Sequence, residues 1–260
     1  IQLFYLFFFF KMSDGDWCCS HTDENGLWYN NRYSEDDWIK GQEILVKRYI
    51  NDKHVIGFEL RNEIRYTIIN NKTIIPTWGT NNITTDWRLA ALKAGNSLLN
   101  INKNILIFVD GLVYTTDFTN FYNYPIHFNI KNKLVYSCHD YSWSQKNINT
   151  QDNLFKYLDN RWGYLSAINK NYTAPIWVSE FGASHNNPAE PWLSWMIQYI
   201  KIRKFGFAYW RLDGTESRGT GRTFNSPALF GLLNSNWNQT ANETYMNIIS
   251  KYLKKNLFIY

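Results

Sequence analysis

From residue 34 onward, the hydrophobic positions of the chain alternate between helical and strand spacing. Ser34, with Asp37 three residues later, is typical of a helix N-cap, and Trp38 and Leu45 continue a helical stripe from it. A second helix is predicted to begin at Thr85. Its apolar positions recur at alternating spacings of four and three residues: Trp87, Ala91, Ala94, Leu98 and Ile101.

Short apolar runs between the helical segments predict parallel strands at residues 54–60, 105–109, 134–137, 176–179 and 205–210. Further helical stripes follow the last three runs, at residues 154–165, 192–199 and 245–252. This repetition of strand and helix favours an α/β fold and fits a (β/α)8 TIM-type barrel. No glycine-rich phosphate loop follows any predicted strand, so a nucleotide-binding doubly wound fold is disfavoured.

Composition agrees with a single barrel domain, since 45% of the 260 residues are hydrophobic. Aromatic residues make up 18%, including twelve tryptophans. We expect most of them in the core and about a quarter at a cleft, where flat rings suit the C–H faces of sugars. The net charge of +5 is spread along the chain, which argues against a nucleic-acid footprint.

The three cysteines, Cys18, Cys19 and Cys138, lack the spacing of a metal site, so we expect no metal. One disulfide from the adjacent pair to Cys138 is compatible with the sequence. An apolar run over residues 3–10 is too short to span a bilayer and lacks the features of a signal peptide, so we expect no membrane partner. We expect a monomer.

Polar residues cluster where the predicted strands end, the place where barrel enzymes carry their chemistry. They are Asn62, Glu63, His139, Tyr141, Glu180 and Trp210. Cleavage of a glycosidic bond uses two carboxyl groups, one to protonate the departing oxygen and one to attack the sugar. A lone glutamate is most often solvated, but Glu63 follows an amide residue and Glu180 precedes Phe181-Gly182 at the tip of an apolar strand.

These motifs resemble glycoside hydrolase family 5, also called cellulase family A. Leu60-Arg61-Asn62-Glu63 is similar to the family's strand-four motif, and Trp177-Val178-Ser179-Glu180-Phe181-Gly182 to its strand-seven motif. The resemblance implies that Glu63 is the acid/base, Glu180 the nucleophile, and Asn62 a contact to the substrate 2-hydroxyl. It also implies that His139 contacts sugar and carboxylate, that Tyr141 bonds the nucleophile, and that Trp210 forms a sugar platform.

Other interpretations remain for some of these residues. His139 could be a satisfied core histidine, and Trp210 could be packing at the barrel mouth. Trp143 could be either a subsite wall or a packed loop aromatic. We expect Asp213 and Glu216 to be loop carboxylates.

The resemblance runs from about residue 12 to the end and covers strands four to eight of the family barrel. We therefore expect a barrel truncated at its N-terminal side, with strands one and two missing. Residues 1–11 are an apolar segment that is either strand three or foreign sequence, and residues 12–260 are a partial hydrolase domain. The strand-two arginine and the strand-three histidine of the family are not found in the sequence.

The family implies retaining hydrolysis of a β-linked glycan without a cofactor, as in an endo-β-1,4-glucanase, by a secreted enzyme. The alternatives are a non-catalytic carbohydrate-binding remnant and a transglycosylase. Because the barrel is incomplete, we expect the chain alone to be aggregation-prone and poorly active.

Overall fold

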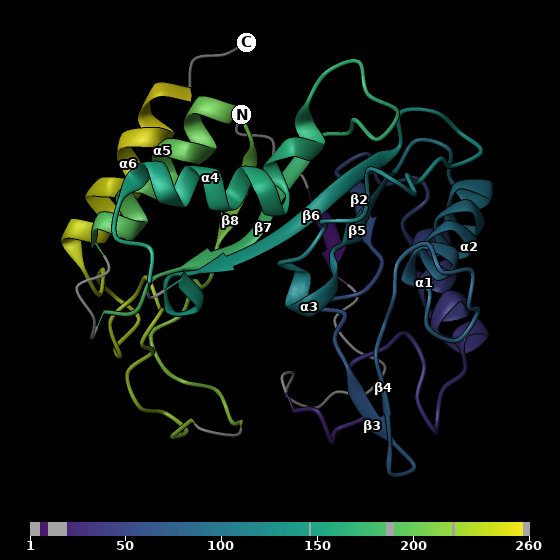
Figure 1. Cartoon of the computed structure of the whole chain (residues 1–260). Coiled ribbons are helices and arrows are strands. Elements are labelled where there is room, and N and C mark those ends of the chain that lie inside the picture. Colours follow the sequence, from purple (N-terminus) through teal and green to yellow (C-terminus); the bar gives the residue numbers. More distant parts are fainter. Residues whose placement is uncertain (1–5, 10–19, 146, 186–189, 220–221, 257–260) are drawn as a thin grey trace. The chain divides into compact units, whose positions relative to one another are not determined.

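The structure is a computed structural model that describes residues 6–9, 20–145, 147–185, 190–219 and 222–256 (Figure 1). The strands are β1 (Leu6–Phe9), β2 (Val55–Glu59), β3 (Thr67–Ile69), β4 (Lys72–Ile74), β5 (Leu106–Asp110), β6 (Leu134–Tyr141), β7 (Ile176–Gly182) and β8 (Gly206–Tyr209). The helices are α1 (Glu35–Arg48), α2 (Trp87–Ile101), α3 (Leu112–Thr115), α4 (Gln151–Arg161), α5 (Glu190–Arg203) and α6 (Glu243–Asn256). Short 3-10 helices occupy Ser142–Gln145 and Gly163–Ser166.

The main sheet has the hydrogen-bonded strand order β1-β2-β5-β6-β7-β8, and β3 pairs with β4 in a separate hairpin. The pairs β1–β2, β2–β5, β5–β6 and β7–β8 are parallel. Each of the five strand runs predicted from residue 54 onward is present. The segment Leu6–Phe9 also forms a strand, in agreement with one of the two interpretations of the apolar N-terminal run.

The chain divides into two compact units. Unit 1 comprises residues 1–138 and 161–176, and unit 2 comprises residues 139–160 and 177–260. Among the described residues, no helix is both long and apolar enough to cross a membrane.

Three buried tryptophans form the centre of unit 1 and anchor its helices to the strand ends. The Trp87 ring lies 5.4 Å from Trp28 and 5.8 Å from Trp38, measured between centroids. The Trp38 indole donates to the carbonyl of Leu60 at 3.0 Å, and the Trp87 indole donates to the carbonyl of Asp110 at 2.8 Å. Helices α1 and α2 lie side by side (Figure 1). These contacts fix the carboxyl ends of β2 and β5.

The core of unit 2 is also aromatic. Phe181 of β7 meets Phe207 and Tyr209 of β8 edge to face, at 5.6 Å and 5.4 Å between centroids. Tyr199 of α5 packs on Phe205, which precedes β8, at 5.9 Å. Helices α5 and α6 run beside each other (Figure 1). The aromatic residues predicted to fill a core therefore do so in both units.

The structure corrects the predicted element boundaries. Helix α2 begins at Trp87 rather than at Thr85, and it is capped by Asp86, whose carboxylate accepts from Arg88 N. Helix α4 ends at Arg161, because the Arg161 carbonyl accepts from Phe118 N and Gly163 follows. Trp162 and Leu165, predicted to lie on that helix, belong to the next turn.

Strands β6 and β7 are longer than predicted. The predicted runs ended at residues 137 and 179, whereas the strands continue to Tyr141 and Gly182. His139, Tyr141 and Glu180 therefore lie within strands instead of following them. The proposed boundary at residues 11 and 12 and the pair Cys18 and Cys19 fall outside the described residues, while Cys138 is buried.

Candidate functional site

In unit 1, Glu63 follows the end of β2 in an unusual backbone conformation. Its φ of +51° lies in the left-handed region, which side chains other than glycine seldom adopt. Its backbone N–H donates to a carboxylate oxygen of Asp110 at 3.0 Å, and the residue is only 7% exposed. Such a conformation persists only where neighbouring contacts fix it.

The residues before Glu63 are held by hydrogen bonds of their own. Arg61 is buried and donates to the carbonyls of Leu27 at 3.0 Å and Asn25 at 2.6 Å. Gln42 of α1 adds a hydrogen bond to the carbonyl of Leu60 at 3.2 Å. Asn62 is 2% exposed, next to Glu63. The motif Leu60-Arg61-Asn62-Glu63 is therefore a rigid part of unit 1, with Arg61 in a structural role.

Asp110, at the end of β5, is a site residue that the sequence analysis missed. One of its carboxylate oxygens accepts both from Glu63 N and from the Thr115 hydroxyl, the latter at 2.7 Å. The residue is fully buried. Its position directly after an apolar run, at a strand end, was the available signal.

In unit 2, two residues of β6 contact the carboxylate of Glu180. The Tyr141 hydroxyl donates to its Oε2 atom at 2.7 Å, and Nδ1 of His139 lies 3.6 Å from the same oxygen. His139 and Glu180 are 1% and 5% exposed. The hydrogen bond favours the ionised carboxylate, which is the form that a nucleophile needs. The structure thus brings together three of the predicted residues of this unit.

Trp210, the residue after β8, approaches the backbone of β7 at Gly182. A Cβ atom at residue 182 would lie 2.5 Å from the carbonyl oxygen of Trp210, so only glycine permits this approach. Trp210 N donates to the carbonyl of Phe181 at 2.9 Å. The Trp210–Arg211 peptide bond is cis.

Trp143 lies near the cluster, in the 3-10 helix that follows β6. Its ring lies 6.1 Å from that of Tyr141 at an interplanar angle of 23°, and it is 58% exposed. The exposure of its indole contradicts tight packing, so its role as a subsite wall stays a prediction.

The loop after β8 holds an ion-pair cluster. Glu216 accepts from Arg211 at 2.6 Å and Leu229 N at 3.1 Å, and it lies 3.4 Å from Arg222. Arg211 also pairs with Asp213, and burial raises the pKa of Asp213 above its usual range. The two residues are carboxylates of this loop, as expected, and both take part in its ion-pair network.

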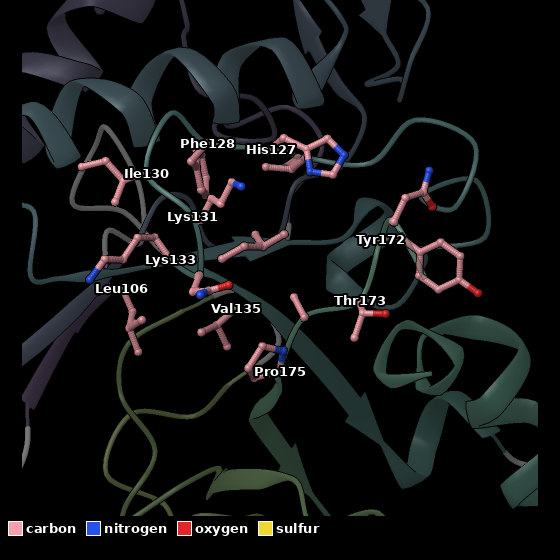
Figure 2. Close-up of a pocket in the computed structure, with 15 residues that line it drawn as sticks. Leu106, His127, Phe128, Ile130, Lys131, Lys133, Val135, Tyr172, Thr173 and Pro175 are labelled. Atoms are coloured by element: carbon pink, nitrogen blue, oxygen red, sulfur yellow. The ribbon is translucent and has the colours of Figure 1, made fainter. Parts of the chain in front are cut away.

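A cavity of about 720 Å³ lies at the other end of β5 and β6, where these strands begin (Figure 2). Leu106, Phe128, Lys131 and Val135 are among the residues that line it. The residues that line it include no carboxylate, so it cannot supply the chemistry of the two glutamates.

A βα repeat whose strands carry buried carboxylates at their ends is typical of barrel enzymes, including those that cleave glycosidic bonds. The family model described as Cellulase (glycosyl hydrolase family 5) matches residues 17–216, and the chain belongs to this family. The resemblance noted in the sequence is thereby confirmed.

Individual relatives support the same assignment. The chain is 34% identical over 251 residues to an endoglucanase of Paenibacillus polymyxa, with 89% of this chain and 58% of the relative covered. It is 34% identical over 86 residues to a major extracellular endoglucanase of Xanthomonas campestris, with 33% of this chain and 16% of that protein covered.

A solved structure of an endocellulase from Pyrococcus horikoshii, in complex with cellotetraose, superposes with a TM-score of 0.76 at 23% identity. The match covers 96% of this chain and 69% of that chain, and it shows a shared fold that is consistent with the expected truncated barrel. The chain spans about half the length of three curated relatives, namely 58%, 42% and 44%.

Proposed function

We propose that this chain hydrolyses β-1,4-linked glucan with retention of configuration, with Glu63 as acid/base and Glu180 as nucleophile. The observation that carries the proposal is the pair of contacts to Glu180. Its carboxylate accepts a hydrogen bond from Tyr141 and lies beside His139. Family membership supports the reaction type, because both glutamates stand at positions that match the family motifs.

The reaction would proceed in two displacements. The Glu180 carboxylate attacks the anomeric carbon while Glu63 gives its proton to the departing oxygen, which leaves a glycosyl-enzyme ester. Glu63 then takes a proton from water, the hydroxide attacks the anomeric carbon, and Glu180 departs. Such chemistry uses carboxyl groups about 5–5.5 Å apart and needs no metal or organic cofactor.

Other residues would orient the sugar. Asn62 offers an amide to the 2-hydroxyl, Trp210 offers a ring face, and Trp143 offers an exposed indole as a subsite wall. The glucan substrate is supported by the endoglucanase relatives and by the cellotetraose complex of the structural neighbour. Action outside the cell is supported by the name of the Xanthomonas campestris relative.

The proposal is tested by the stereochemistry of the products of two variants of the chain. With an aryl β-cellobioside and azide, Glu180→Ala should give the α-glycosyl azide, because azide replaces the missing nucleophile. Glu63→Ala should give the β-glycosyl azide, because azide attacks the glycosyl-enzyme. Glu243→Gln, an exposed carboxylate in α6, serves as the control and should keep wild-type turnover.

Inverted first products from the wild type, or full turnover by Glu180→Gln, would overturn the proposal. Binding of cello-oligosaccharides without any turnover would instead support the carbohydrate-binding alternative. A wild-type excess of longer oligosaccharides over hydrolysis products would support the transglycosylase.

A further inference from the structure

We infer that His21, Tyr66 and Tyr114 form an aromatic ledge in unit 1 that binds the glucose ring on the leaving-group side of the scissile bond. This inference rests on the proposed function, because Glu63 must be the residue that protonates the leaving oxygen. It assigns a chemical class of ligand, a β-linked pyranose ring, to residues that take no part in the two displacements.

The three rings are in direct contact. His21 and Tyr66 stack with centroids 3.7 Å apart and planes inclined by 16°. Tyr114 meets His21 edge to face at 6.1 Å, and its hydroxyl lies 3.4 Å from Nε2 of His21. Tyr66 remains 41% exposed although one of its ring faces is covered by His21. The exposed part of Tyr66 is the surface available to a sugar, whose axial C–H bonds pack against aromatic faces.

The ledge is tied to the backbone around Glu63. Tyr114 N donates to the carbonyl of Ile64 at 3.1 Å. The Arg65 guanidinium donates to the carbonyl of Glu63 at 3.3 Å and lies 5.7 Å from the centre of the Tyr114 ring. These contacts place the ledge beside the acid rather than elsewhere on the unit.

Arg65 is itself fixed, so it acts as a rigid support. It is 1% exposed and pairs with Asp23 at 3.2 Å. Burial raises the pKa of Tyr114, Arg65 lowers it, and the charge of Glu63 raises it further, which agrees with the closeness of the phenol and the acid. A leaving sugar bonded to the oxygen that Glu63 protonates would have its ring within reach of the same group.

The backbone that carries Tyr114 is strained. Val113, Tyr114 and Thr115 have φ angles of 51°, 58° and 62°, three consecutive left-handed residues none of which is glycine. Strain of this kind gathers at binding and catalytic sites, where surrounding contacts maintain it. A loop that served only to connect β5 to the next element would not need this conformation.

The test compares two substrates that differ only in the leaving group. Cellotriose releases glucose, whereas methyl β-cellobioside releases methanol. Both leaving groups depart from an alkyl oxygen that needs the proton of Glu63, but only glucose carries a sugar ring. The variant is Tyr66→Ala, and the matched control is Tyr33→Ala, because Tyr33 is also a 41% exposed tyrosine of unit 1.

We expect Tyr66→Ala to lower kcat/KM about tenfold on cellotriose and less than about twofold on methyl β-cellobioside, since an aromatic contact contributes roughly this much. Tyr33→Ala should change neither value. An equal loss of kcat/KM on both substrates would show that Tyr66 acts through Glu63 or through the fold. An unchanged kcat/KM on cellotriose would show that no sugar ring binds to Tyr66. Either result overturns the inference.

A binding measurement keeps the inference testable without turnover. In the Glu180→Gln chain, titration with cellobiose should shift the imidazole C–H proton signals of His21 in a saturable way, and Tyr66→Ala in the same background should abolish the shift. An unchanged His21 signal at saturating cellobiose contradicts the ledge. Failure of the proposed function is seen separately, as a wild type that cleaves neither substrate.

Discussion

Asp110 should control the position of the proposed acid, and Asp110→Asn tests this. The carboxylate accepts from Glu63 N at 3.0 Å and from the Thr115 hydroxyl at 2.7 Å. Hydrogen bonds to a charged group stabilise by about 1.5–3 kcal/mol, compared with about 0.5–1.5 kcal/mol for neutral pairs. Replacing the charge therefore weakens the two bonds by about 2 kcal/mol together. The neutral side chain also avoids the cost of burying a charge, which offsets part of this loss. The net loss of unfolding free energy should therefore be about 1 kcal/mol.

The effect on catalysis should depend on the leaving group. A general acid contributes about 10²–10⁴-fold to the rate when the leaving group needs a proton. We expect Asp110→Asn to lower kcat/KM on methyl β-cellobioside by about tenfold or more, because a weaker anchor displaces Glu63. On 2,4-dinitrophenyl β-cellobioside, which leaves without a proton, the loss should be less than about threefold. Steady-state kinetics on both substrates and urea unfolding measure the two effects.

Two controls make this prediction refutable. Asp117→Asn removes a carboxylate from the same loop that hydrogen-bonds Thr119, and it should leave the ratio of the two rates unchanged. Thr115→Val removes one donor, and its double-mutant cycle with Asp110→Asn should give a coupling free energy of about 1 kcal/mol. If Asp110→Asn lowers both rates equally, or if the coupling is zero, the positioning role of Asp110 is refuted.

Three further outcomes are expected. Tyr141→Phe removes the 2.7 Å hydrogen bond to Glu180 and should lower kcat on cellotetraose by about 10- to 100-fold, with a smaller change in the urea midpoint. Ser34→Ala removes the capping box of α1 and should lower the unfolding free energy by about 1 kcal/mol, measured by urea unfolding. Because the pKa of Asp213 is raised in the folded chain, chiefly by burial, its stabilisation is present below the unfolded value of 3.8 and lost as pH rises through the folded value. Asp213→Asn should therefore gain stability relative to wild type as pH rises from about 3 to 7, and a flat difference in unfolding free energy would contradict this.

Hydrophobic spacing was sufficient to predict the main strands and helices from residue 54 onward. The runs that became β5 and β7 are mostly apolar because parallel strands are buried on both faces. The helix predicted from Ser34 has the expected capping box with Asp37. In each case the local pattern and the tertiary environment favour the same structure.

The hairpin of β3 and β4 was not predicted, because each strand has only three residues. The turn between them is made by Asn70 and Asn71, both with positive φ, a conformation that asparagine tolerates and that two-residue hairpin turns require. In a chain rich in asparagine this signal is hard to separate from loops. The strand ends β6 and β7 were also cut short, because polar site residues interrupt the apolar pattern on which the boundary depends.

Contacts across the sequence could not be predicted from spacing at all. The bond between Asp110 and the backbone of Glu63 joins residues 47 apart, and the stack of His21 on Tyr66 joins two loops. A motif predicts the chemistry of a side chain, but the partner that orients it depends on the register of strands and the path of loops. Asp110 has no distinguishing neighbour in the sequence, which is why it was missed.

The left-handed residues of unit 1 explain where local rules fail. Glu63, Val113, Tyr114 and Thr115 all have φ between 51° and 62°, and Asp110 bonds both Glu63 and Thr115. Each such residue costs about 1–3 kcal/mol, so one buried carboxylate helps to hold two unfavourable conformations at once. The proposed acid and the proposed sugar-binding ring, which would face the same leaving group, supply a reason for this cost. Sequence-based prediction fails here because contacts between distant residues override the local backbone preference.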